Sequence, residues 1–589
     1  MKKTGLILGA ACILAAVLYF LVTTRMGKGT VANFLPAEVL VCIEQRDLGQ
    51  LLDDFQVSRL GRAVTGIDYV KIAEGLGLPP EDVNRVRDTR KQLDDFLNSP
   101  LFKEFFGQEV TLGILPVPDV SLDIPEKTMR SSLLLIAKPR HNTDILELLT
   151  SLFAEKLAQK SIQYGNYSLK QYLIVEGNTL TTAIVDGYVI AAFDDRLVKE
   201  SLDRYDSKQG SLAQNKEYIR LRHDFIKAKL FTYVSMPALN GQINRLTDDL
   251  DAVQKEDLQK VTDQWKGWAG MAFGAWKEKG ILRDKAVILF NKDLLDPLVG
   301  KMFAIQPVDN KTLAMVPAGV LGYYWTNTLN MNAFWEMFTL EMKESEEQLK
   351  AMEQEVKTVT GVELPQFLSM FGAEAVILLK KIATDGFIPL PDGAIFLKID
   401  KEDEFIKMLG PLIAKSNIPT KTEPYKGVNL TSLEVSFHPS LQPVYVLHQG
   451  YFILATTVDL VKNIIDSAAG DDKGRSNGAG NKDGRSGGLI SDDSFKQVNQ
   501  GLGRGLTKEN NSVSFVRFSS LLHVIKELVS WGGTMLSMED REAAQRSKVM
   551  IEQLIFPLLD GLAMYEVIGS RSRIEGDAIV LESTTILAQ

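Results

Sequence analysis

The chain has 589 residues, of which 45% are hydrophobic and 24% charged, and a formal net charge of −9 at pH 7. These values are ordinary for globular proteins and exclude a largely disordered chain. The acidic balance, without a basic stripe of interleaved aromatic residues, argues against nucleic acid as the main partner.

The first residues predict an uncleaved signal anchor. Lys2 and Lys3 precede an uncharged run, Gly5–Val22, which as a helix would span about 27 Å, close to the ~30 Å hydrocarbon core of a bilayer. We therefore expect residues 1–30 to form a cytoplasmic tip and a transmembrane anchor, with the bulk of the chain outside the cytoplasm. A cleaved signal and a lipoprotein attached at Cys12 are the alternatives.

The two cysteines, Cys12 and Cys42, are too few for a disulfide framework or a structural zinc site. Cys42 lies in a strand-like run, where a free thiol behaves as a small buried hydrophobe. We expect neither a disulfide nor a cysteine-based metal site.

Most of the chain consists of one sequence pattern that occurs twice. The phrase "DGYVIAAFDDRLVKESLD" from Asp186 returns as "QGYFILATTVDLVKNIID" from Gln449. Other blocks recur in the same order in both halves, so we predict an internal duplication. Matched positions include Pro36 and Pro317, Phe106 and Phe371, Glu109 and Glu374, Lys138 and Lys398, Gly187 and Gly450, Lys199 and Lys462, and Asp203 and Asp466.

In chain order, each copy predicts the same series of elements. A strand follows the Pro-Ala start, helices lead to the Phe-Gly turn, and two strands and a helix come next. Paired strands around Gly-Tyr precede the Leu-Val-Lys helix, and a strand, a long polar helical region and two closing strands follow. The expected fold class is α+β, an N-terminal transmembrane helix followed by two similar mixed, largely antiparallel sheet-plus-helix repeats.

We assign residues 31–297 to the first repeat, 298–312 to a linker and 313–589 to the second repeat. The offset between matched positions grows from 263 to 282 across the glycine-rich tract 470–488, a difference of 19 residues, which is the length of the tract. This tract predicts a disordered surface insert.

The apolar N-terminus, the Leu-Pro-Ala strand start, the Phe-Gly turn, the Asp-Gly-Tyr strand and the duplication resemble a bacterial family. Its members are exported, internally duplicated proteins known only as a domain of unknown function. The resemblance implies a cell-envelope location, which together with the anchor predicts a single-pass protein of the bacterial inner (cytoplasmic) membrane. It supplies no catalytic residues to carry over.

Each candidate catalytic residue has a plainer explanation. Ser476 and Ser486 fit G-x-S-x-G, but both lie in the predicted insert, which supplies neither the strand nor the helix of a nucleophile elbow. Asp194 and Asp195 could bind a metal or act as an acid–base pair. The second copy has Thr456, Thr457 and Val458 there, so we expect one aspartate to cap the following helix instead.

Histidines and aromatic residues also favour structural roles. No histidine pair has a metal-ligand spacing, although His438 and His448 flank a short strand region and could converge. Clustered tryptophans could stack on sugars or lie at a membrane interface, but we expect core packing. Leu340–Val359 predicts one amphipathic helix. The other three histidines are His141, His223 and His523, and the clustered tryptophans are Trp265, Trp268, Trp276, Trp325 and Trp335.

The sequence assigns no catalytic, metal-binding or cofactor-binding residues and leaves any ligand-binding residues unknown. Three classes of function remain. The first is a non-catalytic, membrane-anchored envelope protein, a scaffold or binding module with an envelope protein or lipid as partner. The second is a carrier or sensor of a hydrophobic ligand such as a lipid, which requires an apolar cavity in at least one repeat. The third is a hydrolase, which requires polar groups that converge in a cleft.

Overall fold

Contacts divide the chain into two compact units. The computed structural model describes residues 31–588 except 118–124, 141–157, 175–177, 247–250, 342–344, 384–388, 436–440, 474–487 and 540. Unit 1 is Met1–Leu295, Gly533–Leu562 and Asp577–Ile579, and unit 2 is Asp296–Gly532, Ala563–Gly576 and Val580–Gln589. Residues 533–562, which we assigned to the second repeat, therefore pack with unit 1.

The described strands of unit 1 form an antiparallel sheet in the order β4–β5–β6–β7–β3–β2–β1–β8–β9–β10. The strands are β1 (Val41–Arg46), β2 (Glu109–Ile114), β3 (Leu133–Lys138), β4 (Ala158–Tyr164), β5 (Tyr167–Ile174), β6 (Asn178–Val185), β7 (Tyr188–Ala192), β8 (Leu230–Ser235), β9 (Trp268–Glu278) and β10 (Ile281–Phe290).

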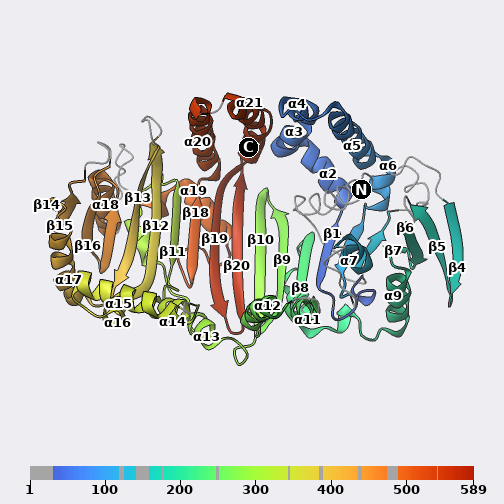
Figure 1. Cartoon of the computed structure of the whole chain (residues 1–589), viewed down its shortest axis with the longest axis horizontal. Coiled ribbons are helices and arrows are strands. Elements are labelled where there is room, and N and C mark those ends of the chain that lie inside the picture. The colour runs from blue at the N-terminus through green and yellow to red at the C-terminus, as the bar shows by residue number, and fades with distance from the viewer. Residues whose placement is uncertain are drawn as a thin grey trace. The chain divides into compact units, whose positions relative to one another are not determined.

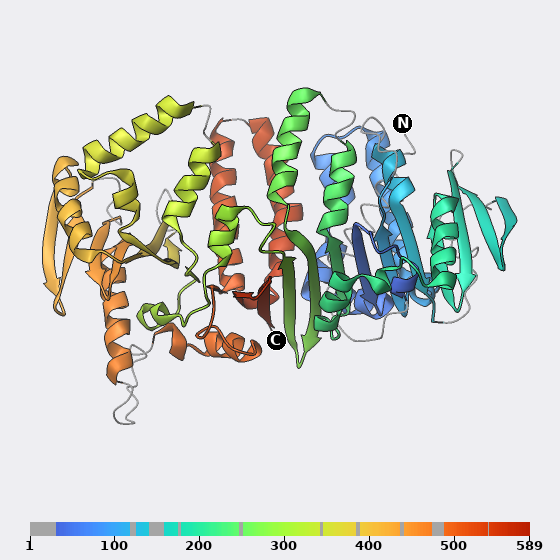
Figure 2. The same ribbon diagram turned by 90° about the horizontal axis from the view of Figure 1, so that it is seen from below.

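Helices lie at both ends of these strands (Figure 1). α2 to α5 lie at one end, and α11 and α12 at the other, where Figure 2 looks onto them. The helices are α2 (Leu48–Val57), α3 (Arg59–Gly66), α4 (Tyr69–Gly75), α5 (Pro80–Asn98), α6 (Pro100–Phe105), α7 (Pro125–Ser132), α9 (Asp195–Ser207), α10 (Lys216–Asp224), α11 (Met236–Leu246), α12 (Ala252–Gln264), α21 (Arg541–Met550) and α22 (Phe556–Leu562).

Unit 2 contains a sheet of the same order, β14–β15–β16–β17–β13–β12–β11–β18–β19–β20, with antiparallel pairings. Its strands are β11 (Gly322–Thr326), β12 (Phe371–Ala383), β13 (Leu390–Ile399), β14 (Thr420–Tyr425), β15 (Val428–Leu433), β16 (Val444–His448), β17 (Tyr451–Ala455), β18 (Ser512–Val516), β19 (Tyr565–Glu575) and β20 (Ala578–Leu587).

The helices of this half complete unit 2, and α20 continues across the division between the units at Gly532. They are α13 (Pro297–Phe303), α14 (Met331–Glu341), α15 (Glu346–Thr360), α16 (Leu364–Leu368), α17 (Glu402–Lys415), α18 (Val458–Lys473), α19 (Asp493–Gly501) and α20 (Phe518–Glu539).

The repeated phrase marks the same hairpin in both units. Asp186 and Gly187, between β6 and β7, have positive φ angles of 49° and 78°, and Gln449 and Gly450 have 51° and 77°. Two successive positive φ angles define a type I′ turn, whose twist suits an antiparallel hairpin. The recurring Gly-Tyr thus pairs a turn glycine with the first residue of a core strand.

The recurring lysines and tyrosines contact each other. Lys138 Nζ lies 4.9 Å from the centre of the Tyr188 ring, and Lys398 Nζ lies 4.8 Å from that of Tyr451. Such cation–π contacts are worth about 0.5–1 kcal/mol at exposed sites and more when desolvated. The matched lysines therefore support the strands that follow the turns.

A second matched contact links the β4–β5 hairpin to α9 in unit 1 and the β14–β15 hairpin to α18 in unit 2. The Tyr164 hydroxyl donates to Asp203 at 2.8 Å, and the Tyr425 hydroxyl donates to Asp466 at 2.9 Å. The recurring lysine lies over the same tyrosine ring in each unit, at 5.8 Å for Lys199 and Tyr164. These contacts explain the recurrence of lysine and aspartate in the phrase. Descent from one ancestral unit stays a prediction.

The predicted fold class and location need correction. The expected transmembrane helix falls in residues 1–30, outside the described residues. In the part of the chain that the structure describes, no helix is both long and apolar enough to cross a membrane. The transmembrane element and the single-pass inner-membrane location built on it are therefore not supported. The antiparallel strands and the helices of both units agree with the remainder of the expected fold class.

Two local expectations also differ from the structure. The helix expected over Leu340–Val359 is divided between α14 and α15, with 342–344 outside the described residues. The expected linker 298–312 contains most of α13.

The expected insert 470–488 is structured at both ends. Helix α18 reaches Lys473, and Gly488 forms an antiparallel bridge with Pro317. Residues 474–487 lie outside the described residues.

Replacing the turn glycines by alanine should destabilise both hairpins. A side chain at φ near +78° costs about 1–2 kcal/mol, so Gly187→Ala should lower the free energy of unfolding by about 1 kcal/mol. Gly450→Ala should lower the free energy of unfolding by more, because its methyl group would lie 2.6 Å from Lys398 Nζ, whereas nothing lies within 4 Å at Gly187. Urea unfolding measures both, and an unchanged midpoint for both variants would contradict the turn assignment.

Candidate functional site: an apolar groove in unit 1

The helices near the N-terminus are bounded by local signals. The Ser58 hydroxyl accepts a hydrogen bond from the Gly61 amide and begins α3, and the Asp68 carboxylate accepts from the Lys71 amide and begins α4. Pro80 occupies the first turn of α5, where its missing N–H leaves no bond unmade. These caps break the segment into short helices that turn around one another.

The C-terminal side of the groove is a helical segment with an irregular turn. The Phe556 amide donates to the Ile551 carbonyl, so Ile551–Ile555 forms a π-helical turn between α21 and α22. Such turns are rare and occur frequently at functional sites. Leu554, Leu558 and Leu562 are spaced four residues apart, which places them on one face of this segment.

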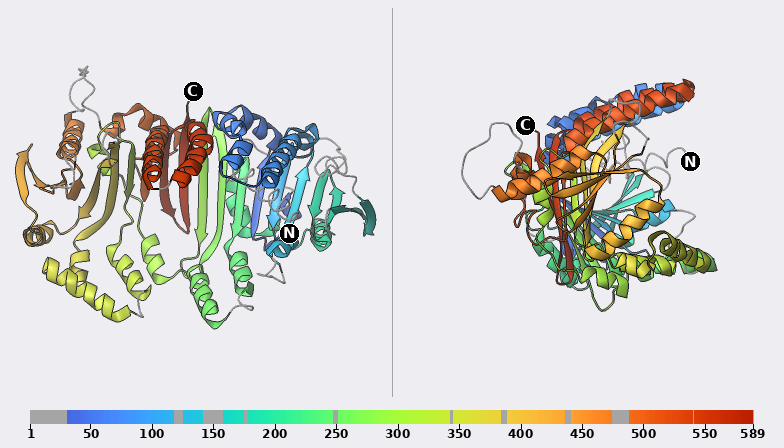
Figure 3. Two further views of the ribbon diagram at one scale, coloured as in Figure 1. Left: turned by 45° about the horizontal axis from the view of Figure 1, so that its top comes forward. Right: turned by 90° about the vertical axis from the view of Figure 1, so that its left-hand side faces the viewer.

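Two glycines allow the N-terminal and C-terminal helices to approach closely. A Cβ atom at Gly561 in α22 would lie 2.8 Å from the Ala63 Cβ and 3.0 Å from the Leu60 Cα, both in α3. A Cβ atom at Gly75 in α4 would lie 2.7 Å from the Val549 side chain in α21. Figure 3 (left) shows the red helices of this segment beside the blue N-terminal helices.

These helices enclose an open groove of about 1270 Å³. All of its lining residues belong to unit 1. The apolar lining residues, with Tyr69 among them, outnumber the polar ones. The apolar set is Leu52, Phe55, Leu60, Val64, Tyr69, Leu78, Val86, Leu93, Leu97, Leu554, Leu558 and Leu562, and the polar set is Gln56, Thr65, Asp82, Arg85, Thr89, Arg90, Asp94 and Asn98.

The charged lining residues are paired with one another on α5. Arg90 Nε lies 2.7 Å from Asp94 Oδ2, and its guanidinium lies 5.0 Å from the centre of the Tyr69 ring. Arg85 Nη2 lies 2.8 Å from Asp82 Oδ1. Two arginines and two aspartates leave the lining with no net charge.

The acidic pair after β7 has the expected capping role. The Asp194 carboxylate accepts from the Arg196 amide at 2.9 Å and caps α9, and Asp195 pairs with Lys199 at 2.7 Å. In unit 2 the Thr457 hydroxyl accepts from the Leu460 amide. The prediction that one aspartate caps the helix is confirmed.

The serines and histidines are not brought together among the described residues. Ser476, Ser486, His141 and His438 lie outside them. His223 is on α10, His448 on β16, and His523 on α20, where its Nε2 lies 3.5 Å from Glu527 Oε1. Within the described ranges no group of three or more His, Cys, Asp or Glu side chains could hold a metal ion.

A buried ionic cluster distinguishes unit 1 from unit 2. Glu44 accepts from the Tyr218 hydroxyl at 2.6 Å and from Arg222 Nε at 3.1 Å. Glu109 lies 3.5 Å from Arg46 Nε, and burial, followed by the charge of Glu44, raises the pKa of Glu109.

The counterpart of this cluster in unit 2 is largely apolar. Trp325 is fully buried and occupies the position that matches Glu44. Its Nε1 donates to Glu374, the match of Glu109, at 3.0 Å. In unit 1 the charge of Arg46 is compensated by ion pairs with Glu44 and Glu109, although Arg46 Nη1 and Nη2 and Glu109 Oε1 have no hydrogen-bond partner among the described groups.

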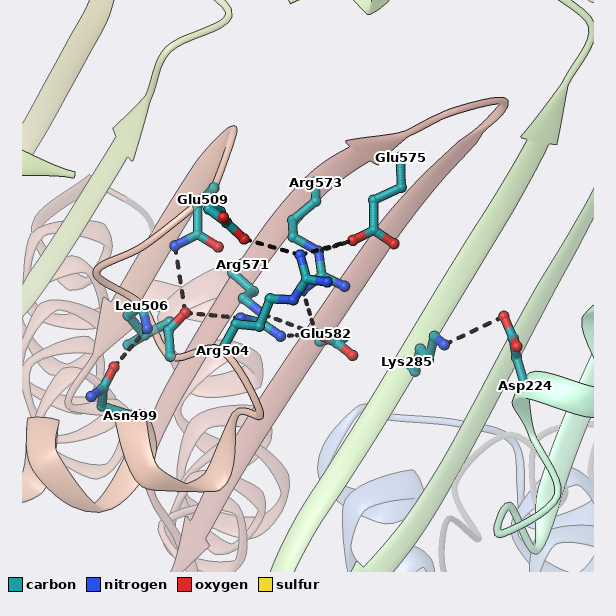
Figure 4. A network of polar contacts seen from close by, with 12 residues as sticks. Asp224, Lys285, Asn499, Arg504, Leu506, Glu509, Arg571, Arg573, Glu575 and Glu582 are labelled. Atoms are coloured by element: carbon teal, nitrogen blue, oxygen red, sulfur yellow. Dashed lines mark hydrogen bonds and ion pairs between the residues drawn. The ribbon is translucent and has the colours of Figure 1, made fainter. Parts of the chain in front are cut away.

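Unit 2 has its own closed ion-pair network (Figure 4). Arg571 is 3% exposed; its Nε donates to Glu582 at 2.9 Å and its Nη1 donates to the Gly505 carbonyl at 3.0 Å. Arg573 Nε lies 3.0 Å from Glu575 Oε1, and burial lowers the pKa of Arg573. Because these charges already pair with one another, the network stabilises β19.

The fold and the groove together define a two-unit α+β protein with an apolar helical groove in unit 1. Residues 102–387 match a family described as "Protein of unknown function (DUF3352)". This match covers less than half of the chain, and it agrees with the expected resemblance to a domain of unknown function. The bacterial origin and the duplication stay predictions. No curated protein sequence and no solved structure matches the chain.

The sequence contained only weak signals for the groove. Val86, Leu93 and Leu97 form a stripe on an otherwise polar helix, and Leu554, Leu558 and Leu562 form another. Each stripe alone indicates only an amphipathic helix. Nothing in the sequence paired two stripes that lie more than 400 positions apart.

We predict that Gly561→Leu separates α22 from α3. A larger side chain there has no space against the α3 backbone, and overpacking costs about 1–3 kcal/mol. Hydrogen exchange should show faster exchange of the amides of residues 541–562. Gly66→Ala, at the end of α3 with nothing within 4 Å, is the matched control, and equal exchange in both variants would refute the contact.

His448 predicts a pH dependence of stability. Burial lowers the pKa of its imidazole below the usual 6.5, and its Nε2 has no hydrogen-bond partner among the described groups. The fold favours the neutral ring, so stability is lost as the pH falls below about 6.5. His448→Gln should remove this loss between pH 7 and pH 5 in urea unfolding. His523→Gln, at an exposed position, should not; a parallel loss in wild type and His448→Gln would exclude His448 as its source.

Proposed function

We propose that the protein binds an apolar ligand, such as a lipid, in the groove of unit 1. The observation that carries this proposal is a groove of about 1270 Å³ whose apolar side chains come from both the N-terminal and the C-terminal helices. Ligand sites are concave, mostly apolar and furnished with a few polar groups. The groove has this composition.

The carrier hypothesis required an apolar cavity in at least one repeat, and unit 1 supplies one. The scaffold hypothesis requires no cavity, and among the described features none favours it over the carrier. We therefore prefer ligand binding, and we assign the groove a binding rather than a catalytic role.

Filling the groove should weaken binding. Leu93 lies on the lining face of α5, so Leu93→Trp should lower the affinity for the neutral probe N-phenyl-1-naphthylamine at least about tenfold, the factor given by ~1.4 kcal/mol. Fluorescence titration of the full chain measures this. Stability should change little, because Leu93 is only partly buried.

Lys91→Trp is the matched control, since Lys91 is exposed and lies on the opposite face of α5. It adds the same indole to the same helix without entering the groove. Equal affinity of both variants for the probe would place the ligand elsewhere and contradict the proposal.

A further inference from the structure

The lining face of α5 has an apolar centre and charged flanks. At 3.6 residues per turn, Val86, Leu93 and Leu97 fall in one stripe. The same geometry places the Asp82–Arg85 pair on one flank of the stripe and the Arg90–Asp94 pair on the other. A ligand lying along the stripe therefore meets an ion pair at the edge of the groove.

The two ion pairs differ in their surroundings. The Arg90 side chain is 26% exposed and lies over the Tyr69 ring, whereas the Arg85 side chain is 51% exposed. Exposed pairs of this kind contribute about 0–1 kcal/mol, so either pair can exchange partners at little cost. Arg90 is the better placed of the two, because its guanidinium is held between an aromatic face and a carboxylate.

Charge complementarity restricts the polar part of the ligand. A head group with one net charge would pair with Arg90 or with Asp94 and leave the other side chain without its partner. A head group that carries both charges pairs with both: its phosphate accepts hydrogen bonds from the guanidinium, and its cationic ammonium group forms an ion pair with the carboxylate. The neutral lining of the groove therefore fits a zwitterion.

The size of the groove restricts the apolar part. Pockets for drug-sized ligands measure about 300–1,000 Å³, and this groove measures about 1270 Å³. The excess volume suits a ligand with two hydrocarbon chains. Leu554, Leu558 and Leu562 line the same groove as the α5 stripe and would contact those chains.

We propose that the ligand is a zwitterionic phospholipid whose acyl chains lie in the groove and whose head group exchanges partners with the Arg90–Asp94 ion pair. This inference rests on the proposed function, since it names the class of ligand that the same groove takes. No covalent step is involved.

The test uses three lipids with identical acyl chains, presented to the full chain in detergent micelles. Phosphatidylcholine carries both charges, phosphatidylglycerol carries one negative charge, and diacylglycerol carries none. Native mass spectrometry measures the bound fraction of each. Phosphatidylcholine should bind about tenfold more tightly than phosphatidylglycerol, and its advantage over diacylglycerol should depend on the ion pair.

Three variants distinguish recognition of the head group from binding of the acyl chains in the groove. Arg90→Gln should lower the affinity for phosphatidylcholine about tenfold and leave that for diacylglycerol unchanged. Arg87→Gln, at an exposed arginine of α5 outside the groove lining, should change neither. The double variant Arg90→Asp with Asp94→Arg keeps an ion pair on the same flank and should restore the preference for phosphatidylcholine.

The outcomes distinguish the two proposals. If wild type binds none of the three lipids, the proposed function fails. If it binds all three equally, or prefers phosphatidylglycerol, or if Arg90→Gln keeps the full preference, the head-group inference is overturned while lipid binding by the groove stands.

Discussion

The groove depends on the close approach of α22 to α3. This approach is possible because Gly561 has no side chain where the backbone of Leu60 and the methyl group of Ala63 come near. The same device recurs at Gly75, against Val549. With both contacts made, residues 533–562 complete a wall that the N-terminal helices cannot supply alone. Small residues at two helix crossings thus determine whether unit 1 holds a cavity, since close-packed helices tolerate little added volume.

The two units share a strand order and a set of contacts, yet they differ in what they bury. Each has the lysine over the tyrosine that follows the type I′ turn, and each fastens its outer hairpin through a tyrosine and an aspartate. In unit 1 the matched core position is Glu44 in an ionic cluster, whereas in unit 2 it is the buried indole of Trp325. The shared contacts stabilise the fold that both units have in common. The matched core positions differ, so the interior of unit 1 is ionic where that of unit 2 is largely apolar.

Ionic groups in the two units mostly satisfy one another. The Arg571–Glu582 network and the Glu44–Arg222 pair are buried and balanced, and removing one partner of such a pair would leave an uncompensated buried charge. The ion pairs on α5 differ, because they lie at the edge of an open apolar groove. This difference makes the groove, rather than either buried network, the place to look for a ligand.

The sequence by itself determined the local features: the repeated turn, the cap at Asp194 and the family model that residues 102–387 match. These depend on residues close together in the chain, where φ preferences and capping act directly. It also predicted a transmembrane helix, which no described helix supports. Only the tertiary structure decided that residues 533–562 pack with unit 1 and that leucines from the two ends of the chain line one groove. An amphipathic stripe shows that a helix must be covered, but which surface covers it is decided by packing between segments distant in sequence.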